Sequence, residues 1–290
     1  MANGIIIVDK PAGWTSQDVT AKLRGVFHTR RVGHGGTLDP MATGVLPVFV
    51  GRATRAASFC ESAEKEYIAQ LRLGLVTNTQ DTSGEIVSES PVHVTKDDLL
   101  AILPRFSGRI SQIPPMYSAV KIGGKKLYEL ARKGQEIERA PREITIHELE
   151  LLGSDGADYT LRVRCSKGTY IRTLCHDIGQ MLGCGGCMAG LRRTRAGNFT
   201  LAQSMPMDSI VAHRDPEELL LPVDSLFSQH PPLIVTLAQA QKLRNGAQVC
   251  DRQFADGTCR VYGETGEFLL LGRMEHGVLT TIKSFFEVDT

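Results

Sequence analysis

The stretch RVGHGGTLDPMATGVLPVFVG, residues 31–51, joins a glycine-rich segment to one of the longest apolar runs of the chain. Four glycines and one proline fall within residues 31–44, so we expect a loop that turns sharply and lets another group approach closely. Asp39 stands in this loop, five residues after His34. An aspartate at this place either caps a turn or is a carboxylate presented from a rigid loop as a nucleophile or acid–base group.

The rest of the composition is that of an ordinary globular protein. The chain has 290 residues, of which 42% are hydrophobic and 22% charged, which excludes disordered, collagenous and disulfide-scaffold classes. No apolar run approaches the roughly 18 residues that a membrane span needs, and the start, MANGIIIVDKPAG, lacks the features of a signal peptide. Seven scattered cysteines, an odd number, fit a reduced protein, so we expect a cytoplasmic location and no membrane partner.

Charge is distributed unevenly along the chain. Residues 1–60 carry seven Lys/Arg against three Asp/Glu, and residues 160–200 carry seven against one. Residues 201–290 are acidic, with seven against twelve. If the fold brings the two basic segments together, they form a positive face suited to a polyanion, and we expect them to line the cleft of the functional site. The alternative is two solvated basic surfaces that point apart.

Local patterns predict both strands and helices. GIIIVDK (4–10) has the pattern of a buried strand that stops at Pro11, and residues 16–27 have the pattern of a helix with Ser16 as N-cap. Residues 95–106 predict a second helix, capped by Thr95. Further strands are expected over residues 67–74, 144–153 and 158–175, the last running into a turn at Lys167-Gly168 and followed by a helix over 176–182.

These elements predict an α+β fold with a mixed, mostly antiparallel sheet, flanking helices and a cleft across the sheet. Paired prolines in SQHPPL (228–233) mark the best linker. We therefore expect a large domain over residues 1–228 and a small all-β module over residues 232–290.

Seven blocks of the large domain, taken in order, resemble the TruB-type tRNA pseudouridine synthases. The blocks are VDKPAGWTS (8–16), RVGHGGTLDPMATGVL (31–46), EKEYIA (64–69), TQDTSGE (79–85), IPPMYSAVK (113–121), SKGTYIRTL (166–174) and LRRTRAGNF (191–199). They span about 190 residues, and seven matches in a fixed order leave little room for chance. The C-terminal module also resembles the PUA-like RNA-binding barrel found at the end of many members.

The resemblance implies an isomerisation of uridine to pseudouridine at position 55, in the T-loop of tRNA. Such enzymes break the C1′–N1 bond, rotate the base and rejoin it through C5, with one aspartate and neither cofactor nor metal. Here that aspartate is Asp39. A carboxylate can attack a carbon centre or move protons, and both roles remain open.

The resemblance also assigns residues that hold the uridine. A flipped base needs a stacking partner, and Tyr67 matches the stacking tyrosine. Tyr170 and Arg172, which would share one face of a strand, match a pocket residue and the partner of Asp39. Leu191 matches a leucine that closes over the base, and His34 matches a histidine that contacts the RNA loop. From the residues alone, Tyr67 and Leu191 are equally typical of a core, Arg172 of a surface cation and His34 of a structural histidine.

For two further segments the resemblance implies a functional role, and an ordinary structural role is the alternative. Asp81 matches an acidic residue near the site, although capping of its own turn explains it equally well. The insertion over about residues 111–147, with Lys121, Lys125 and Lys126, resembles a clamp that grips the RNA stem through phosphates. Otherwise it is a solvated basic helix. Gly123-Gly124 would allow a hinge.

Other functions are compatible with parts of the sequence. An RNA-binding or tRNA-folding factor could use the same clamp with catalysis secondary, but a pure binder would not need Asp39, Tyr67, Tyr170 and Arg172 together. The CGGC at 184–187 could be redox-active or half of a zinc site, although no second pair follows at zinc-finger spacing. We expect the chain to act on the T-arm as a monomer, without an obligatory protein partner.

Overall fold

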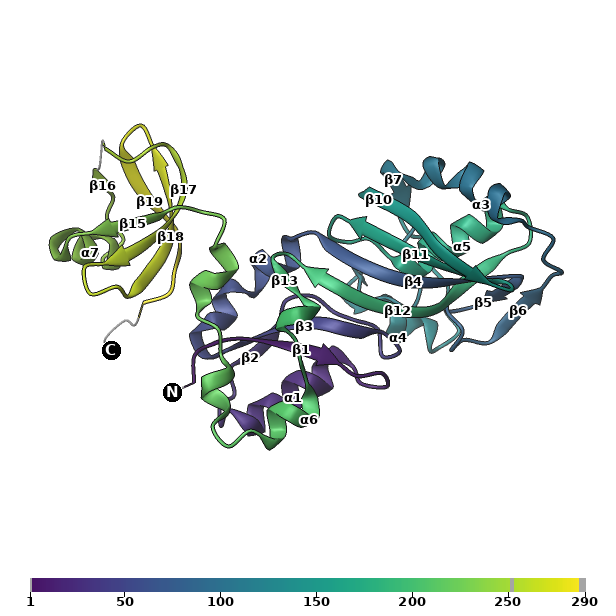
Figure 1. Ribbon diagram of the computed structural model, residues 1–290, viewed down its shortest axis with the longest axis horizontal. Coiled ribbons are helices and arrows are strands. Elements are labelled where there is room, and N and C mark those ends of the chain that lie inside the picture. Colours follow the sequence, from purple (N-terminus) through teal and green to yellow (C-terminus); the bar gives the residue numbers. More distant parts are fainter. Residues whose placement is uncertain (1, 251–252, 287–290) are drawn as a thin grey trace.

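The computed structural model describes residues 2–250 and 253–286, and its two large sheets lie in two adjoining parts of the chain, with two further two-stranded hairpins (Figure 1). The larger part is built on a ten-stranded sheet, and the smaller C-terminal module on a five-stranded sheet. No helix in the described ranges is long and apolar enough to cross a membrane.

The large sheet is mixed and mostly antiparallel, as predicted. Its strands follow the order β14-β1-β3-β12-β4-β11-β10-β7, and two short strands, β2 and β13, pair with β3 and β12. Within the described part of this sheet, only the pairs β1–β14 and β12–β3 are parallel. The bounds are β1 Gly4–Lys10, β2 Val32–His34, β3 Thr43–Val50, β4 Lys65–Leu73, β7 Gly108–Gln112, β10 Arg142–Asp155, β11 Asp158–Cys165, β12 Gly186–Ala196, β13 Phe199–Thr200 and β14 Met205–Pro206.

Strand β12 lies in the middle of this sheet, between β3 and β4. The basic block LRRTRAGNF, for which the sequence predicted no element, thus forms the end of a central strand. Register shifts between Met188 and Gly190 and between Arg193 and Arg195 mark bulges in its pairing with β4. Such bulges re-aim the following side chains.

Helix α1 (Ser16–Val26) follows β1, but its cap differs from the prediction. Thr15, not Ser16, is the N-cap, because its hydroxyl accepts the Asp18 N–H while the Asp18 carboxylate accepts the Thr15 N–H. Ser16 is buried instead, and its hydroxyl oxygen accepts the N–H of Leu38 at 2.9 Å. The predicted cap Thr95 of α3 (Lys96–Ile102) is confirmed and forms the same reciprocal box with Asp98.

The strand predicted over residues 158–175 is wrong beyond Cys165. Strand β11 ends there, Gly168 turns the chain with φ at 79°, and helix α5 (Ile171–Met181) begins. Tyr170 is the N-cap residue and Arg172 lies in the first helical turn, so the two side chains do not share a strand face. Burial of Ile171, Leu174 and Ile178 shows the helical period that replaces the expected alternation.

The remaining helices cover the sheet or link its strands. They are α2 (Ala57–Ser62) and α6 (Met207–Ala212), with short 3₁₀ turns at Gly51–Ala56 (η1), Leu103–Phe106 (η2), Leu201–Gln203 (η3), Pro216–Leu219 (η4) and Val223–Phe227 (η5). A separate hairpin, β5 (Leu75–Thr77) and β6 (Ile86–Glu89), carries the segment around Asp81.

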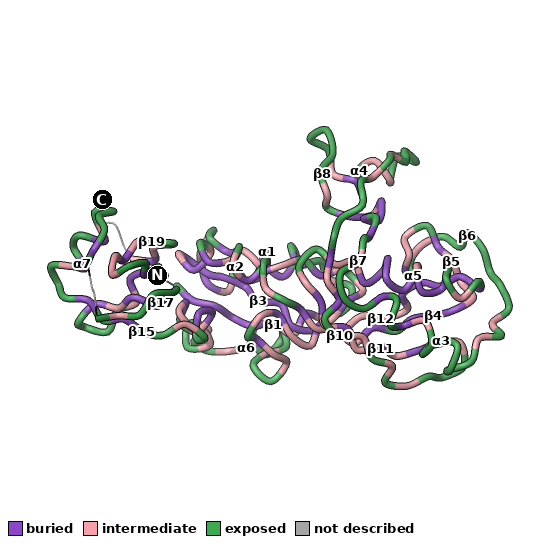
Figure 2. Tube along the Cα trace, turned by 90° about the horizontal axis from the view of Figure 1, so that it is seen from above, coloured by how far each residue is buried: buried purple, intermediate pink, exposed green. Residues whose placement is uncertain are grey.

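The insertion after β7 stands away from the body (Figure 2). It contains the hairpin β8 (Lys121–Ile122) and β9 (Lys125–Lys126) and the short helix α4 (Leu127–Ala131). Gly123 and Gly124 form its turn with φ of 58° and 81°, a conformation that favours glycine.

The C-terminal module is mainly β, with one helix that the sequence did not predict. The strands are β15 (Pro232–Val235), β16 (Val249–Cys250), β17 (Gly257–Gly263), β18 (Phe268–Glu275) and β19 (Val278–Ser284), in the order β15-β17-β18-β19-β16. Helix α7 (Leu237–Arg244) packs against the strands of the module, which has a hydrophobic core separate from that of the large sheet.

A shared apolar cluster joins the module to the body. Phe227 is 2% exposed and packs edge-on against Phe59 at 5.2 Å between ring centroids. On the module side it meets Phe285 at 5.8 Å and Phe268 at 6.2 Å. The segment before the predicted linker therefore anchors the module.

Replacing Phe227 tests this anchor. Phe227→Ala should lower the free energy of unfolding by about 3–5 kcal/mol, because it removes a fully packed ring and leaves a cavity. Urea titration followed by fluorescence measures the change. Leu237→Ala, at a residue 77% exposed, is the control and should be nearly neutral. Equal midpoints for the two variants would mean that the cluster contributes little.

Candidate functional site

The carboxylate of Asp39 faces the guanidinium of Arg172 in a two-point contact. Arg172 Nε lies 2.9 Å from Asp39 Oδ2, and Arg172 Nη2 donates to Oδ1 at 3.2 Å. The Arg172 side chain is 7% exposed, whereas that of Asp39 is 32% exposed. The carboxylate is thus held from the protein side and open on the other, as a group that meets a substrate must be.

Backbone carbonyls of two other segments hold Arg172 in place. Its Nη2 donates to the carbonyl of Tyr117 at 2.8 Å, and its Nη1 donates to that of Thr79 at 3.1 Å. A buried guanidinium needs such acceptors, because leaving its N–H groups unpaired costs several kcal/mol. Arg172 therefore joins the Asp39 loop, the β5–β6 loop and the root of the insertion.

Asp81 caps its own turn and also lies near Arg172. Its Oδ1 accepts hydrogen bonds from Thr79 Oγ1 at 2.8 Å, Ser83 N at 3.0 Å and Ser83 Oγ at 2.5 Å, so it caps its own turn. Its other oxygen, Oδ2, lies 3.9 Å from Arg172 Nε. The hydrogen bonds that cap the turn therefore also hold the Asp81 carboxylate close to the Arg172 guanidinium.

Gln112 is a positioning residue that the sequence analysis missed. It ends β7, is 1% exposed, and donates from Nε2 to the Tyr170 carbonyl at 3.2 Å. The Tyr170 N–H donates back to Gln112 Oε1 at 3.0 Å. The amide thus fixes the backbone at the start of α5, two residues before Arg172. Its only signal in the sequence is a polar residue at the end of an edge strand.

Tyr67 lies on β4 in the main core, and it is 8% exposed. Burial raises the pKa of its phenol, an effect that the nearby Arg193 charge partly offsets. The Asp39 charge also acts on this phenol. Tyr67 therefore belongs both to the core and to the surroundings of Asp39.

Arg193 is a buried cation that the sequence had placed in a merely basic segment. It is 1% exposed, and its Nε donates to the Val45 carbonyl at 2.7 Å. Its terminal nitrogens donate to the carbonyls of Gly36 at 3.1 Å and Thr37 at 3.4 Å. One side chain thus ties together the two ends of the loop that carries Asp39.

Gly44 lets this loop meet β12. Its φ is 101°, and a Cβ at this position would lie 2.2 Å from the Arg193 carbonyl oxygen. Both the backbone conformation and the close contact require glycine.

Lys10 is the second missed cation. It is fully buried, and its ammonium donates to the carbonyls of Pro11 at 2.8 Å, Trp14 at 2.6 Å and Pro40 at 3.2 Å. Burial lowers the pKa of Lys10 to about 8, although the nearby negative charge of Asp39 acts to raise it. The ammonium thus supports the backbone next to Asp39.

The other predicted residues lie around this centre or away from it. His34 ends β2 half-buried, its Nδ1 has no partner in the described chain, and burial lowers its pKa, with a further contribution from the Arg193 charge. Leu191 is a half-buried residue of β12 that packs against the core. Lys121 and Lys125 are exposed, and Lys126 is half-buried over the Tyr128 ring, all three on the projecting hairpin rather than beside Asp39.

The CGGC thiols are poorly placed for reactive chemistry. Both Cys184 and Cys187 are buried and free, and burial raises the pKa of Cys187 to about 11. The protonated thiol is a weak nucleophile and a weak metal ligand. Within the described ranges, no three His, Cys, Asp or Glu side chains gather as metal ligands would.

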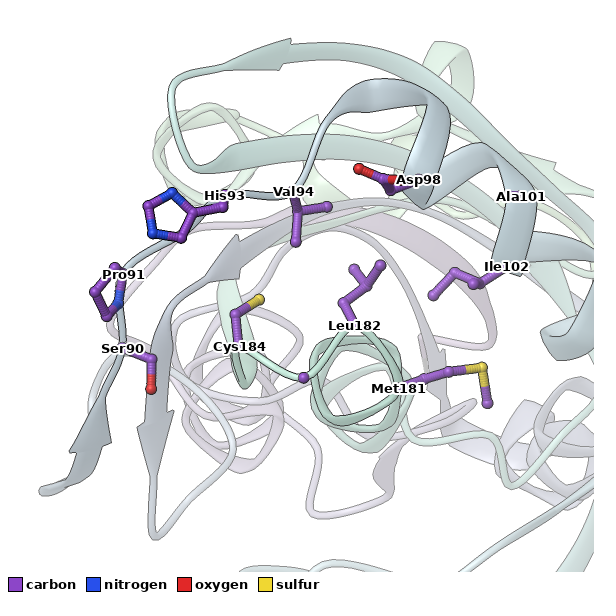
Figure 3. A pocket seen from close by; sticks show the side chains of 11 residues that line it. Ser90, Pro91, His93, Val94, Asp98, Ala101, Ile102, Met181, Leu182 and Cys184 are labelled. Carbon is purple, nitrogen blue, oxygen red and sulfur yellow. The ribbon is translucent and has the colours of Figure 1, made fainter.

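A separate hollow of about 580 Å³ opens at the far end of α5 (Figure 3). His93, Ile102, Met181, Leu182 and Cys184 contribute to its wall. Since α5 carries Arg172 at its start and Met181 at its end, the hollow is about one helix length, roughly 15 Å, from the carboxylate. It is not part of the Asp39 site.

Family profiles match almost the whole chain. Residues 24–171 match the profile described as "TruB family pseudouridylate synthase (N terminal domain)", and residues 172–228 match "tRNA pseudouridylate synthase B C-terminal domain". Residues 231–281 match "Pseudouridine synthase II TruB, C-terminal".

Comparison with individual proteins also finds relatives named as pseudouridine synthases. The tRNA pseudouridine synthase B of Clostridium kluyveri is 42% identical, covering 98% of this chain and 99% of that protein. The protein of the same name from Pseudomonas fluorescens is 44% identical, covering 94% and 92%. A chain in the crystal structure of a Cbf5-Nop10-Gar1 complex has a TM-score of 0.75 at 27% identity, covering 98% of this chain and 85% of that one.

Two neighbouring arginines provide a matched test of the buried one. Arg193→Met should lower the free energy of unfolding by about 3 kcal/mol, since it leaves buried carbonyls without donors. Arg192→Met removes a half-exposed cation that pairs with Asp9, and should cost less than about 1 kcal/mol. Equal losses in chemical denaturation would contradict the bracing role of Arg193.

The pKa of Lys10 gives a pH-dependent prediction. The amine titrates near 10.5 in the unfolded chain and near 8 in the folded protein, so folding releases a proton between these pH values. The unfolding free energy then rises with pH across this window, by at most about 1.4 kcal/mol per unit. The stability advantage of the parent over Lys10→Met should therefore grow from about pH 8 to pH 10 in urea titrations. A constant difference would mean that Lys10 titrates normally when folded.

Proposed function

Because the chain belongs to the TruB family of pseudouridine synthases, we propose that it converts one uridine of tRNA, at position 55 in the T-loop, to pseudouridine. The observation that carries this proposal is the pairing of a half-open carboxylate, Asp39, with the buried guanidinium of Arg172. The curated relatives are named for tRNA. The T-loop position rests on the resemblance of the seven sequence blocks.

The reaction is an internal rearrangement. The C1′–N1 bond breaks, the uracil turns, and a C1′–C5 bond forms, while the proton leaving C5 is balanced by the one gained at N1. No atom or electron is lost to an external acceptor, so the proposal needs no cofactor. Asp39 serves either as the nucleophile at carbon or as the group that moves protons. In both roles Arg172 holds its orientation.

The uridine has to leave its loop before this bond can be reached, and the site offers surfaces to hold it. Tyr67, from β4, is proposed to stack on the base, with Tyr170 lining the pocket and Leu191 closing over it. His34, at the end of β2, is proposed to contact the RNA loop. Its lowered pKa means that it acts as a neutral imidazole near pH 7.

The projecting insertion is proposed to grip the T-arm stem. Lys121, Lys125 and Lys126 lie on a hairpin that stands clear of the body (Figure 2), where phosphates can reach them. Contacts of this kind position an RNA without reading its sequence. We propose that the protein works as a monomer, without an obligatory protein partner, on cytoplasmic tRNA.

The competing function is an RNA-folding factor that binds the same substrate with catalysis secondary. A binder has no use for a carboxylate whose oxygens are both fixed by one buried arginine. The two functions separate when chemistry and binding are measured on the same variant.

Asp39→Asn supplies that measurement. It keeps the size of the side chain and removes its charge, so pseudouridine formation should be abolished while the Kd for tRNA stays within a few-fold. Product is mapped by carbodiimide primer extension on an unmodified transcript, with Asp97→Asn on exposed α3 as control. A single new stop at the T-loop uridine with the parent is expected. Loss of binding together with activity would indicate a folding or binding role for Asp39.

The clamp is tested by salt. Each lysine–phosphate contact releases counterions, so Lys125→Ala/Lys126→Ala should lower the slope of log Kd against log salt by about one to two. Lys96→Ala/Arg105→Ala removes two exposed cations near α3 and should leave the slope unchanged. An equal slope for both double variants would mean that the hairpin faces away from RNA.

A further inference from the structure

A second basic surface lies on the body, apart from the clamp. Residues 19–60 contain six Lys/Arg and a single acidic residue, Asp39, which is engaged by Arg172. Four of the six cations are exposed, and within the described chain none of the four forms an ion pair. They are Lys22, Arg30, Arg31 and Arg55, named here the α1–β2 basic surface.

The fold places these four residues close together. Lys22 lies on α1, which packs against β2, and Arg30 and Arg31 directly precede β2. Strand β2 pairs with the end of β3, where Val32 lies opposite Val50. The 3₁₀ turn with Arg55 follows at once, and its first N–H, of Gly51, donates to the Arg31 carbonyl at 2.8 Å.

This surface is separated from the catalytic carboxylate by the length of β3. The Asp39 loop joins β3 near Gly44, and the basic surface lies at Val50, six residues and about 20 Å further along the strand. The root of the clamp meets the site from another direction, through the Tyr117 carbonyl on Arg172. In Figure 1, α1 and β2 lie between the clamp and the C-terminal module along the length of the molecule, and Figure 2 shows α1 in the same place.

From this arrangement we infer that the α1–β2 basic surface binds phosphates of the tRNA outside its T-arm. The inference rests on the proposed function. If the T-loop is at Asp39 and its stem under the clamp, RNA that continues past the loop meets this surface. Three of the four cations are arginines, whose planar forks match phosphate oxygens in two-point contacts. Because none of the four cations forms an ion pair in the described chain, no surface salt bridge of the fold depends on them.

The test compares two RNAs on one variant. Arg30→Gln/Arg31→Gln/Arg55→Gln is measured on full-length unmodified tRNA and on an isolated T-arm hairpin, for Kd over a salt series and for pseudouridine formation. The full-length tRNA should bind at least about tenfold more weakly, with a salt slope lowered by about two to three. The affinity for the isolated T-arm RNA and the turnover of that RNA should remain within twofold of the parent values.

A matched triple variant controls for net charge. Lys96→Gln/Arg105→Gln/Arg214→Gln removes three exposed cations elsewhere and should leave both RNAs bound as by the parent. Equal losses of affinity on tRNA and hairpin would overturn the inference, because the surface would then contact the T-arm itself. Unchanged binding of both would also overturn it. Failure of the proposed function is distinct, since the parent would then form no pseudouridine in either RNA.

Discussion

The buried guanidinium of Arg172 is the interaction on which the site depends. It binds both oxygens of Asp39 and the carbonyls of Thr79 and Tyr117, and so connects a loop after β2, the β5–β6 hairpin and the root of the clamp with helix α5. Removing one acceptor would leave part of this buried guanidinium without a hydrogen bond, at a cost of about 1–3 kcal/mol. These contacts therefore hold the four segments in a single arrangement. In it, the Asp39 carboxylate is oriented before any substrate binds.

Two further buried cations extend this principle to the backbone of the Asp39 loop. Arg193 holds the carbonyls of Gly36, Thr37 and Val45, and Lys10 holds that of Pro40. Gly44 permits the close approach that Arg193 requires. A loop would otherwise be among the more mobile parts of a protein, and these contacts make it a rigid support, as preorganised catalysis demands. The β8–β9 hairpin projects away from this network, to which only the root of its insertion is tied, through the Tyr117 carbonyl.

Much of the fold follows from local patterns, and what does not follow depends on distant contacts. The buried run of β1 and the capping box at Thr95 are local signals, and both predicted their elements correctly. TYIRTLC alternates as a strand does and so predicts a strand that holds Tyr170 and Arg172. In the structure the chain turns at Gly168, and the packing of α5 makes this segment the first helical turn. Arg193 resembles its solvated neighbours in sequence, and Gln112 has its partner 58 residues away, so neither could be identified before the structure.

The most direct test of the account is the single-turnover rate of Arg172→Lys on unmodified tRNA, measured together with its Kd. Lysine keeps the charge but cannot make the two-point contact with Asp39 while also reaching both carbonyls. Losing about 3 kcal/mol of positioning predicts a rate at least about a hundredfold lower, with tRNA affinity within a few-fold of the parent. A rate within threefold of the parent would contradict the claim that this one guanidinium sets the catalytic geometry.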